Sequence, residues 1–144
     1  MKCVVQRVRS ASVRVADRTV AAIGPGMLVL AAVVKGDDEA GVRATARKLR
    51  DLRIFADPAG KMNLDLAQSG GEILAVSQFT LAGSIDRGRR PSFEAAEEPG
   101  RAKELFETLV GELGATGIPV RTGHFREMML VTLENDGPVT FVLG

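Results

Sequence analysis

The stretch MLVLAAVV, residues 27–34, is the longest uninterrupted apolar run in the chain. Short apolar runs of this kind are typical of a strand that is buried on both faces of a sheet. The run is far shorter than the roughly 20 residues that a membrane-spanning helix needs. Gly24-Pro25-Gly26 is a turn signal before it, and Gly36-Asp37-Asp38-Glu39 after it has the N-cap and early acidic residues of a helix start. The region therefore predicts a buried strand followed by a helix.

Further strands are indicated on both sides of this run. Upstream, apolar and polar residues alternate over 3–8, and β-branched residues are frequent over 12–15 and 19–23. Asp17-Arg18 predicts a hairpin turn between the last two of these segments. Downstream, strands are predicted over residues 52–55, 72–78, 128–134 and 139–143.

Two segments have the apolar spacing of amphipathic helices. The first begins after the acidic turn and carries Val42, Ala46 and Leu49 on one face. The second spans Pro99 to Leu113, and its apolar face consists of Ala102, Leu105, Phe106 and Leu109. Strands and helices in this order predict a mixed α+β fold with sheet layers and two main helices. With 144 residues, the chain has the size of one domain, and we expect a single domain over residues 1–144.

The composition is that of an ordinary globular protein, with 45% apolar and 26% charged residues. Lys and Arg number 19 and Asp and Glu number 18, so the net charge of +1 excludes a generally polycationic nucleic-acid coat but not a local basic patch. A single cysteine, Cys3, and a single histidine, His124, exclude an intramolecular disulfide and a multi-histidine metal site. We expect no metal, no cofactor and no membrane segment. The N-terminal MKCVVQRVRS lacks a signal-peptide stretch, which favours a cytoplasmic protein.

The segment Ser77-Gln78-Phe79-Thr80-Leu81 lies where a predicted strand opens into a loop rich in arginine. Polar residues cluster here, where the strand would otherwise continue apolar. The segment either carries function or is a strand end whose hydroxyls bond to the backbone, and both interpretations remain open. No Walker-type or GxGxxG phosphate loop is present. His124 has no obvious carboxylate partner for a Ser-His-Asp triad, so a structural or exposed role is favoured for it.

The segment Asn135-Asp136-Gly137-Pro138-Val139-Thr140 lies between the last two predicted strands. Asp-Gly between apolar strands is a hairpin signal. Proline is awkward directly after it, because proline cannot donate to a strand ladder. The Gly-Pro bond also has an accessible cis form. On spacing alone, a plain turn is the favoured interpretation.

Together, SQFTL and NDGPVT resemble the two signature motifs of the D-aminoacyl-tRNA deacylases, formerly called D-tyrosyl-tRNA deacylases. Further segments that look like this family follow in order, at residues 5–8, 11–13, 23–26, 53–55, 60–63 and 90–93. The resemblance covers essentially the whole chain. It implies a deacylase-like β/β/α sandwich and a homodimer with active sites at the subunit interface.

The resemblance also implies a reaction. The family hydrolyses the ester between a D-amino acid and the terminal adenosine of tRNA, removes glycine misplaced on alanine tRNA, and spares L-aminoacyl-tRNA. This activity would serve translation quality control. Gly137-Pro138 would be cis and enter the neighbouring subunit's pocket, where its carbonyls hold the substrate's amino group. Arg7 matches the arginine that braces this pair. Ser77, Gln78, Phe79 and Thr80 would line the reacting ester, and Met129 matches a position near the adenosine pocket.

Two routes are open for cleavage of the ester. Thr80 as a nucleophile would need a base to activate it, and the sequence offers no histidine or carboxylate beside it. An aminoacyl ester is already activated, so positioning and an oxyanion donor such as a backbone amide near Phe79 can suffice. We favour this backbone-led route, in which the resemblance adds the substrate's own ribose hydroxyl.

The chain departs from the family pattern at a few positions. Gly123-His124-Phe125 replaces the common Gly-Arg-Phe, Met128-Met129-Leu130 replaces Asp-Met-Gln, and Gly83-Ser84-Ile85 replaces Ala-Asp-Thr. These departures bear on the contacts with adenosine and the rest of the tRNA, and not on the reaction class.

Two sets of arginines are candidates for RNA contact. A solvated face is favoured for Arg43, Arg47 and Arg50 of the first helix, and the role of Arg87, Arg89 and Arg90 beside SQFTL is left open. Two rival functions are a non-catalytic RNA-binding module of the same fold and a hydrolase of other small esters or amides. The two intact motifs favour the deacylase, and the absence of Trp and Tyr argues against a platform on which bases stack.

Overall fold

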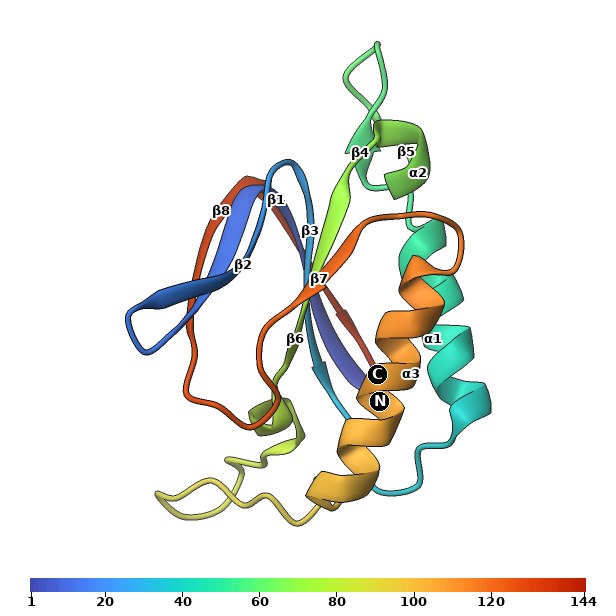
Figure 1. Ribbon diagram of the computed structural model, residues 1–144. Helices are drawn as coiled ribbons and strands as arrows, with labels where there is room; N and C mark the ends of the chain where they lie inside the picture. Colours follow the sequence, from blue (N-terminus) through green and yellow to red (C-terminus); the bar gives the residue numbers. More distant parts are fainter.

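The computed structural model describes residues 1–144 without a gap. In chain order the elements are β1 (Lys2–Val15), β2 (Arg18–Ile23), β3 (Gly26–Ala32), α1 (Glu39–Asp51), β4 (Phe55–Ala56), β5 (Met62–Leu64), α2 (Leu66–Ser69), β6 (Glu72–Ser77), the 3-10 turn η1 (Phe79–Ala82), α3 (Pro99–Gly114), β7 (Val120–Thr122) and β8 (Leu130–Leu143). Figure 1 shows a curved sheet with α1 and α3 side by side against one face. The predicted α+β class, the mixed sheet and the two main helices are confirmed, and the short α2 adds a third helix.

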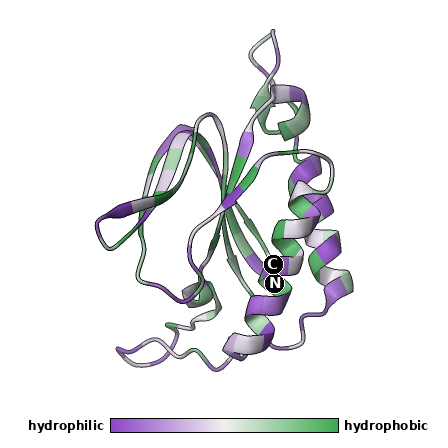
Figure 2. Ribbon diagram, in the orientation of Figure 1, coloured by the Kyte–Doolittle hydropathy of each residue, from purple (hydrophilic) through white to green (hydrophobic).

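Strand β3 lies in the middle of the sheet and is buried on both faces, as its apolar run predicts. It pairs antiparallel with β1 and parallel with β6. Met27 and Val29 belong to the core beneath the helices, whereas Leu28 belongs to a second apolar cluster on the opposite face. Figure 2 shows the hydrophobic residues along the central strands and on the helix sides that face them. The sheet is therefore a middle layer between two cores.

Strand β1 is a single long strand, although the sequence predicts separate strands over 3–8 and 12–15. Its first half pairs with β3 and its second half with β2. Ser10, in the polar segment between the two predicted strands, pairs with Glu134 of β8, although the register with β8 shifts between Val8 and Ser10. Strand β8 pairs only with β1, so its outer edge has no partner strand within the chain.

The two main helices begin at residues suited to helix starts. The Asp38 side chain accepts a backbone hydrogen bond as N-cap of α1, and Pro99 lies in the first turn of α3. Arg43 lies 3.3 Å from the Glu112 carboxylate, and Arg50 donates to the Glu112 carbonyl. Both arginines therefore tie α1 to α3.

The short elements differ most from expectation. The predicted strand over 52–55 is wrong, because Leu52 is the C-cap of α1 and strand β4 covers only Phe55–Ala56. The sequence pattern indicates none of β5, α2 and β7, which have too few residues to show a period. Strand β7 pairs parallel with β6, which places the loop after Thr122 at the sheet end where Ser77 lies. None of the helices combines the length and the apolar character needed to cross a membrane.

Cys3 lies in the core beneath the helices. Burial raises the pKa of its thiol to about 11. Because the thiolate is the nucleophilic form of cysteine, the burial of Cys3 and its raised pKa both argue against it as the nucleophile of this protein.

Candidate active site

The segment that carries Gly137 and Pro138 is a bulge within β8 and not a turn between two strands. Gln6 of β1 pairs with Thr140, and Val8 pairs with Asn135, so both halves of β8 run in the same direction along β1. The preferred interpretation of this segment as a plain turn is therefore wrong. The chain leaves the ladder and returns to it, and the intervening Gly137–Pro138 peptide is cis and exposed.

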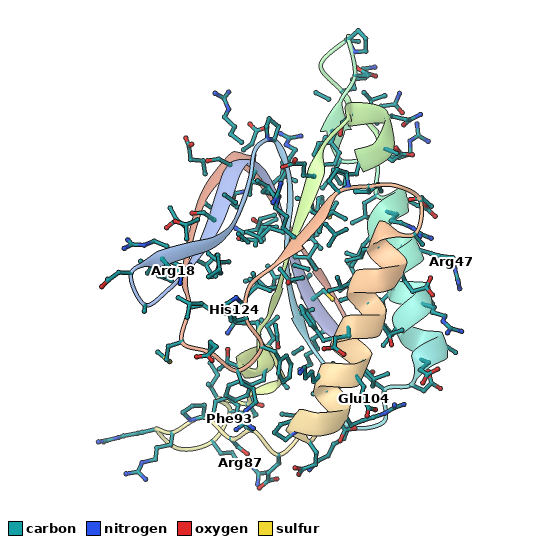
Figure 3. All side chains as sticks on the ribbon, in the orientation of Figure 1. Arg18, Arg47, Arg87, Phe93, Glu104 and His124 are labelled. Carbon is teal, nitrogen blue, oxygen red and sulfur yellow. The ribbon has the colours of Figure 1, made fainter.

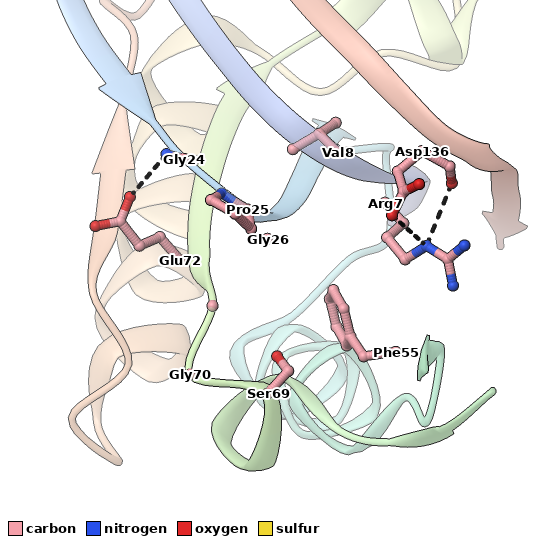
Figure 4. Close-up of a pocket in the computed structure, with 11 residues that line it drawn as sticks. Arg7, Val8, Gly24, Pro25, Gly26, Phe55, Ser69, Gly70, Glu72 and Asp136 are labelled. Carbon is pink, nitrogen blue, oxygen red and sulfur yellow. Dashed lines mark hydrogen bonds and ion pairs between the residues drawn. The ribbon is translucent and has the colours of Figure 1, made fainter. Parts of the chain in front are cut away.

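Arg7 holds the bulge from the side of β1. Its Nε donates to the Asp136 carbonyl at 3.2 Å and lies 3.3 Å from an oxygen of the Asp136 carboxylate. Its Nη1 donates to the Ile54 carbonyl at 2.7 Å. Figure 4 shows Arg7 beside Asp136, with the two interactions between these residues drawn as dashed lines. The guanidinium thus joins the bulge to the segment between α1 and β4.

Asn135 closes the base of the bulge. Its Nδ2 donates to the Arg7 carbonyl and to the Val139 carbonyl, at 3.0 Å in both cases. The Thr140 hydroxyl donates to Asn135 Oδ1 at 3.3 Å and accepts from the Gln6 amide at 3.2 Å. These side chains connect the strands where the backbone pairs are missing. Sequence reasoning did not single out Asn135, although an Asn side chain close to a Gly-Pro pair can form such local hydrogen bonds to the backbone.

Gly137 adopts a conformation that favours glycine. Its φ is +126°, and a Cβ at this position would lie 2.6 Å from Val139 Cγ2 and 3.1 Å from Arg7 Nη2. An added methyl group would therefore displace both the bulge and the arginine that holds it.

The SQFTL segment forms the end of β6 and the turn η1. The backbone N–H of Gln78 donates to the Ala31 carbonyl at 2.8 Å. The chain then turns into η1, where Phe79 and Thr80 are exposed. The amides of Phe79 and Thr80 open this turn, and the first amides of a helical turn have no partner within it. The Thr80 hydroxyl accepts a hydrogen bond from Gln78 Nε2, and no ionisable group contacts it. The side-chain amide of Gln78 is not a base, so it cannot activate the Thr80 hydroxyl by removing its proton.

The structure does not bring the two motifs together within one chain. Ser77 is in register with Ala31 of β3, whereas Arg7 is in register with Met27. These positions differ by about 13 Å along the strands, and β6 and β8 lie about 14 Å apart across the sheet with β3 and β1 between them. The Gly137–Pro138 bulge and the SQFTL turn therefore occupy different regions of the sheet.

The remaining residues singled out from the sequence lie in separate places. Met129 is half-buried in the second apolar cluster, where a Cβ on Gly123 would meet its sulfur at 2.6 Å. His124 is exposed and lines a shallow groove with Lys103, Phe106 and Phe125. A cavity of about 400 Å³ lies beside the bulge, and of the predicted site residues only Arg7 lines it. No cluster of three or more His, Cys, Asp or Glu side chains is placed to hold a metal ion.

The sequence of this chain is similar to those of known proteins. Residues 4–144 match the sequence profile of the family described as D-Tyr-tRNA(Tyr) deacylase. A D-aminoacyl-tRNA deacylase of Geotalea uraniireducens is 54% identical over 143 residues, which make up 99% of this chain and 92% of that protein. The D-aminoacyl-tRNA deacylase of Geobacter sulfurreducens is also 54% identical, over 99% of this chain and 94% of its own length.

Two solved structures are similar over nearly their whole length. A protein described as c-Myc DNA Unwinding Element Binding Protein has a TM-score of 0.95 and 37% identity, and the match covers 100% of this chain and 98% of that one. A probable eukaryotic D-amino acid tRNA deacylase has a TM-score of 0.83 at 18% identity, over 99% and 97% of the two chains, and shares the fold. The family profile and the curated relatives agree along the chain. The chain therefore belongs to the D-Tyr-tRNA(Tyr) deacylase family and is a hydrolase, as its two motifs predict.

Proposed function

We propose that the protein hydrolyses the ester between a D-amino acid and the terminal adenosine of tRNA, releasing both, and that it also removes glycine from mischarged alanine tRNA. It acts in the cytoplasm as a single deacylase domain in translation quality control, without a metal or cofactor. The observation that carries the proposal is the presence of both family motifs with the Gly137–Pro138 pair cis, exposed and held by Arg7.

A second copy of the chain completes the site in this proposal. The bulge and η1 lie too far apart in one chain to contact the same aminoacyl group. The unpaired outer edge of β8 exposes Phe141 and Val142, at 41% and 75% of their surface. Apolar side chains on an unpaired edge are a natural interface between copies. A two-fold dimer through this region inserts the bulge of each copy into the site of the other, next to SQFTL.

Replacing Val142 by lysine tests the dimer. The side chain is already exposed, so we expect the subunit to keep its fold while dimerisation and deacylation are lost together. Analytical ultracentrifugation at micromolar concentration, alongside the activity assay, measures both. Lys61→Ala, at an exposed site away from β8, serves as a control. A wild-type protein that sediments as an active monomer would refute the shared site.

Selectivity for D-amino acids follows from geometry. Gly137 and Pro138 have no register partner in β1, so their carbonyls are available for the substrate's amino group. With the amino group and the ester both fixed, the side chain and the α-hydrogen take two defined directions, and a wall along one of them excludes L-amino acids. Glycine has no side chain to exclude. A selectivity of about 10⁴ corresponds to roughly 5.5 kcal/mol, which a clash in a rigid pocket supplies.

The chemistry is assigned to the backbone of η1 and the substrate's ribose hydroxyl. The Phe79 amide is the proposed oxyanion donor, and Ser77, Gln78 and Thr80 line the ester. Met129 packs near the adenosine. This assignment is supported by the opening amides of η1 and by the absence of a base next to Thr80 within its own subunit.

Thr80→Ala and His124→Ala should each keep kcat/KM within about tenfold of wild type, because loss of a true nucleophile or base costs about 10⁴-fold or more. Single-turnover deacylation of D-aminoacyl-tRNA measures this. Thr80→Ser is the matched control, since it keeps the hydroxyl. A collapse of activity in Thr80→Ala that Thr80→Ser restores would establish Thr80 as the nucleophile instead.

Hydrolysis of one tRNA preparation charged with a D-amino acid, one charged with its L-form and one charged with glycine tests the function as a whole. We expect rapid release of the D-amino acid and of glycine, and no release of the L-form. If no amino acid is released from any of the three preparations, the result would favour a non-catalytic RNA-binding module of this fold. Equal release of both enantiomers, or turnover of free esters without tRNA, would indicate a general esterase.

A further inference from the structure

The loop between η1 and α3 carries an unpaired cluster of positive charge. Arg87, Arg89 and Arg90 are all exposed, and no ion pair involves any of them. The only acid within residues 84–92 is Asp86, whose carboxylate accepts a hydrogen bond from the Ser84 hydroxyl. Three guanidinium groups on one short loop therefore face solvent without an internal partner. Figure 3 labels Arg87 on this loop, close to Phe93.

The loop is attached firmly to the candidate catalytic turn. Ser84 and Ser92 exchange two backbone hydrogen bonds of 2.8 and 2.9 Å, which close the loop at its base. The next residue, Phe93, packs against Phe79 with ring centroids 5.1 Å apart. Its ring also lies over Gly83, where a Cβ would come within 2.8 Å of it. The arginines are thus connected through Phe93 to both ends of η1.

The arginines of α1 are arranged differently. Arg43 and Arg50 are bound to Glu112 and serve the packing of α1 on α3. Arg47 is exposed on α1, on the far side of the molecule from the loop in Figure 3. The structure therefore separates the two arginine sets that the sequence left as candidates. Only the set on the loop lies next to η1 and has no structural partner.

We propose that the loop 84–92 is a phosphate-binding arm for the acceptor end of tRNA, with Arg87, Arg89 and Arg90 contacting backbone phosphates close to the aminoacylated adenosine. Guanidinium groups suit this task because they bind phosphate oxygens through paired, charge-assisted hydrogen bonds. The Phe93 contact positions the arm so that a strand bound to the arginines leads its last nucleotide to η1. The inference rests on the proposed function and adds the residues that bind the nucleic acid.

The test compares two triple variants with equal loss of charge. Arg87→Ala/Arg89→Ala/Arg90→Ala removes the arm, and Arg47→Ala/Lys48→Ala/Lys61→Ala removes three exposed charges elsewhere that form no ion pair. Each is assayed on D-aminoacyl-tRNA and on D-aminoacyl-adenosine, which has no phosphate. We expect the arm variant to lose about tenfold or more in kcat/KM on tRNA, and the slope of log kcat/KM against log salt to flatten by about 2 to 3. Its activity on D-aminoacyl-adenosine, and the control variant on both substrates, should stay within about twofold of wild type.

A second experiment tests the arm without any catalysis. It measures the binding of an acceptor-stem hairpin that ends in CCA and carries no amino acid, by fluorescence anisotropy at several salt concentrations. The same flattening is expected there for the arm variant alone. Equal losses on tRNA and on D-aminoacyl-adenosine would overturn the proposal, because the arm would then act by shaping η1. An unchanged salt slope in both assays would also overturn it. A wild-type protein that binds the hairpin through the arm but hydrolyses neither substrate would refute the proposed function and leave the arm supported.

Discussion

Gly137→Ala will reduce kcat/KM for D-aminoacyl-tRNA by about 100-fold or more, because small displacements at a positioning element have effects of this size. The new Cβ would lie 2.6 Å from Val139 Cγ2, 3.0 Å from the Val139 nitrogen and 3.1 Å from Arg7 Nη2. The φ of +126° is also unfavourable for alanine. The bulge must move, and the carbonyls proposed to hold the amino group move with it.

Single-turnover rates with D- and L-aminoacyl-tRNA measure this loss and the accompanying change in selectivity. Gly111→Ala is the matched control, since a Cβ there meets nothing within 4 Å and the residue lies within α3. It should leave activity unchanged. Thermal unfolding of both variants shows whether the subunit stays folded. Wild-type rates and an unchanged D-to-L ratio in Gly137→Ala would remove the bulge from the mechanism.

Arg7→Ala is expected to be almost as damaging, with a loss of about 100-fold in kcat/KM. The side chain is only 14% exposed, and its removal leaves the Asp136 and Ile54 carbonyls without their charged donor. Hydrogen bonds to charged groups contribute about 1.5–3 kcal/mol each, so the bulge loses its attachment to the rest of the subunit. Discrimination between D- and L-substrates should fall together with the rate.

The neighbouring Arg9 provides a control that contacts the same partner. It lies 3.8 Å from the Asp136 carboxylate, with a side chain that is 77% exposed, and exposed pairs of this kind contribute little. Arg9→Ala should stay within about threefold of wild type. Arg7→Lys should recover part of the activity, since an ammonium group offers one centre of charge in place of a fork that spans two carbonyls. An Arg7→Ala variant that loses stability but keeps its full D-to-L ratio would reduce Arg7 to a structural role.

Local patterns predicted the elements that are long enough to carry a clear sequence signal. The apolar run over 27–34 indicated β3 because a strand buried on both faces needs no alternation. The acidic start and apolar spacing of α1, and Pro99 before the apolar face of α3, were sufficient for the two helices. The short β4, β5 and β7 were missed or misplaced because two or three residues carry no periodic signal.

The bulge shows why the candidate site was only partly predictable. Asn-Asp-Gly is a turn signal when read alone, but the partner that decides its shape is Arg7, far away in sequence. Pairing with β1 on both sides turns the expected hairpin into a bulge, which moves Asn135 from a turn position into a clamp. The motifs identified the family, whereas their separation across the sheet follows from strand register, which no local pattern contains.

The pairing of β1 with β8 also has a consequence for how the protein reaches its native state. Cys3 pairs with Leu143 and Arg14 with Leu130, so this ladder has a very high contact order. Such pairings form late and slowly, because chain entropy must be lost before the contacts stabilise it. The Gly137–Pro138 bulge exists only once this last ladder has closed. A chain that has not yet formed this ladder would therefore expose a long bare edge of β1, prone to association with other chains, and would lack the Gly137–Pro138 bulge. In the wild-type chain, deacylase activity therefore requires that this last ladder has closed.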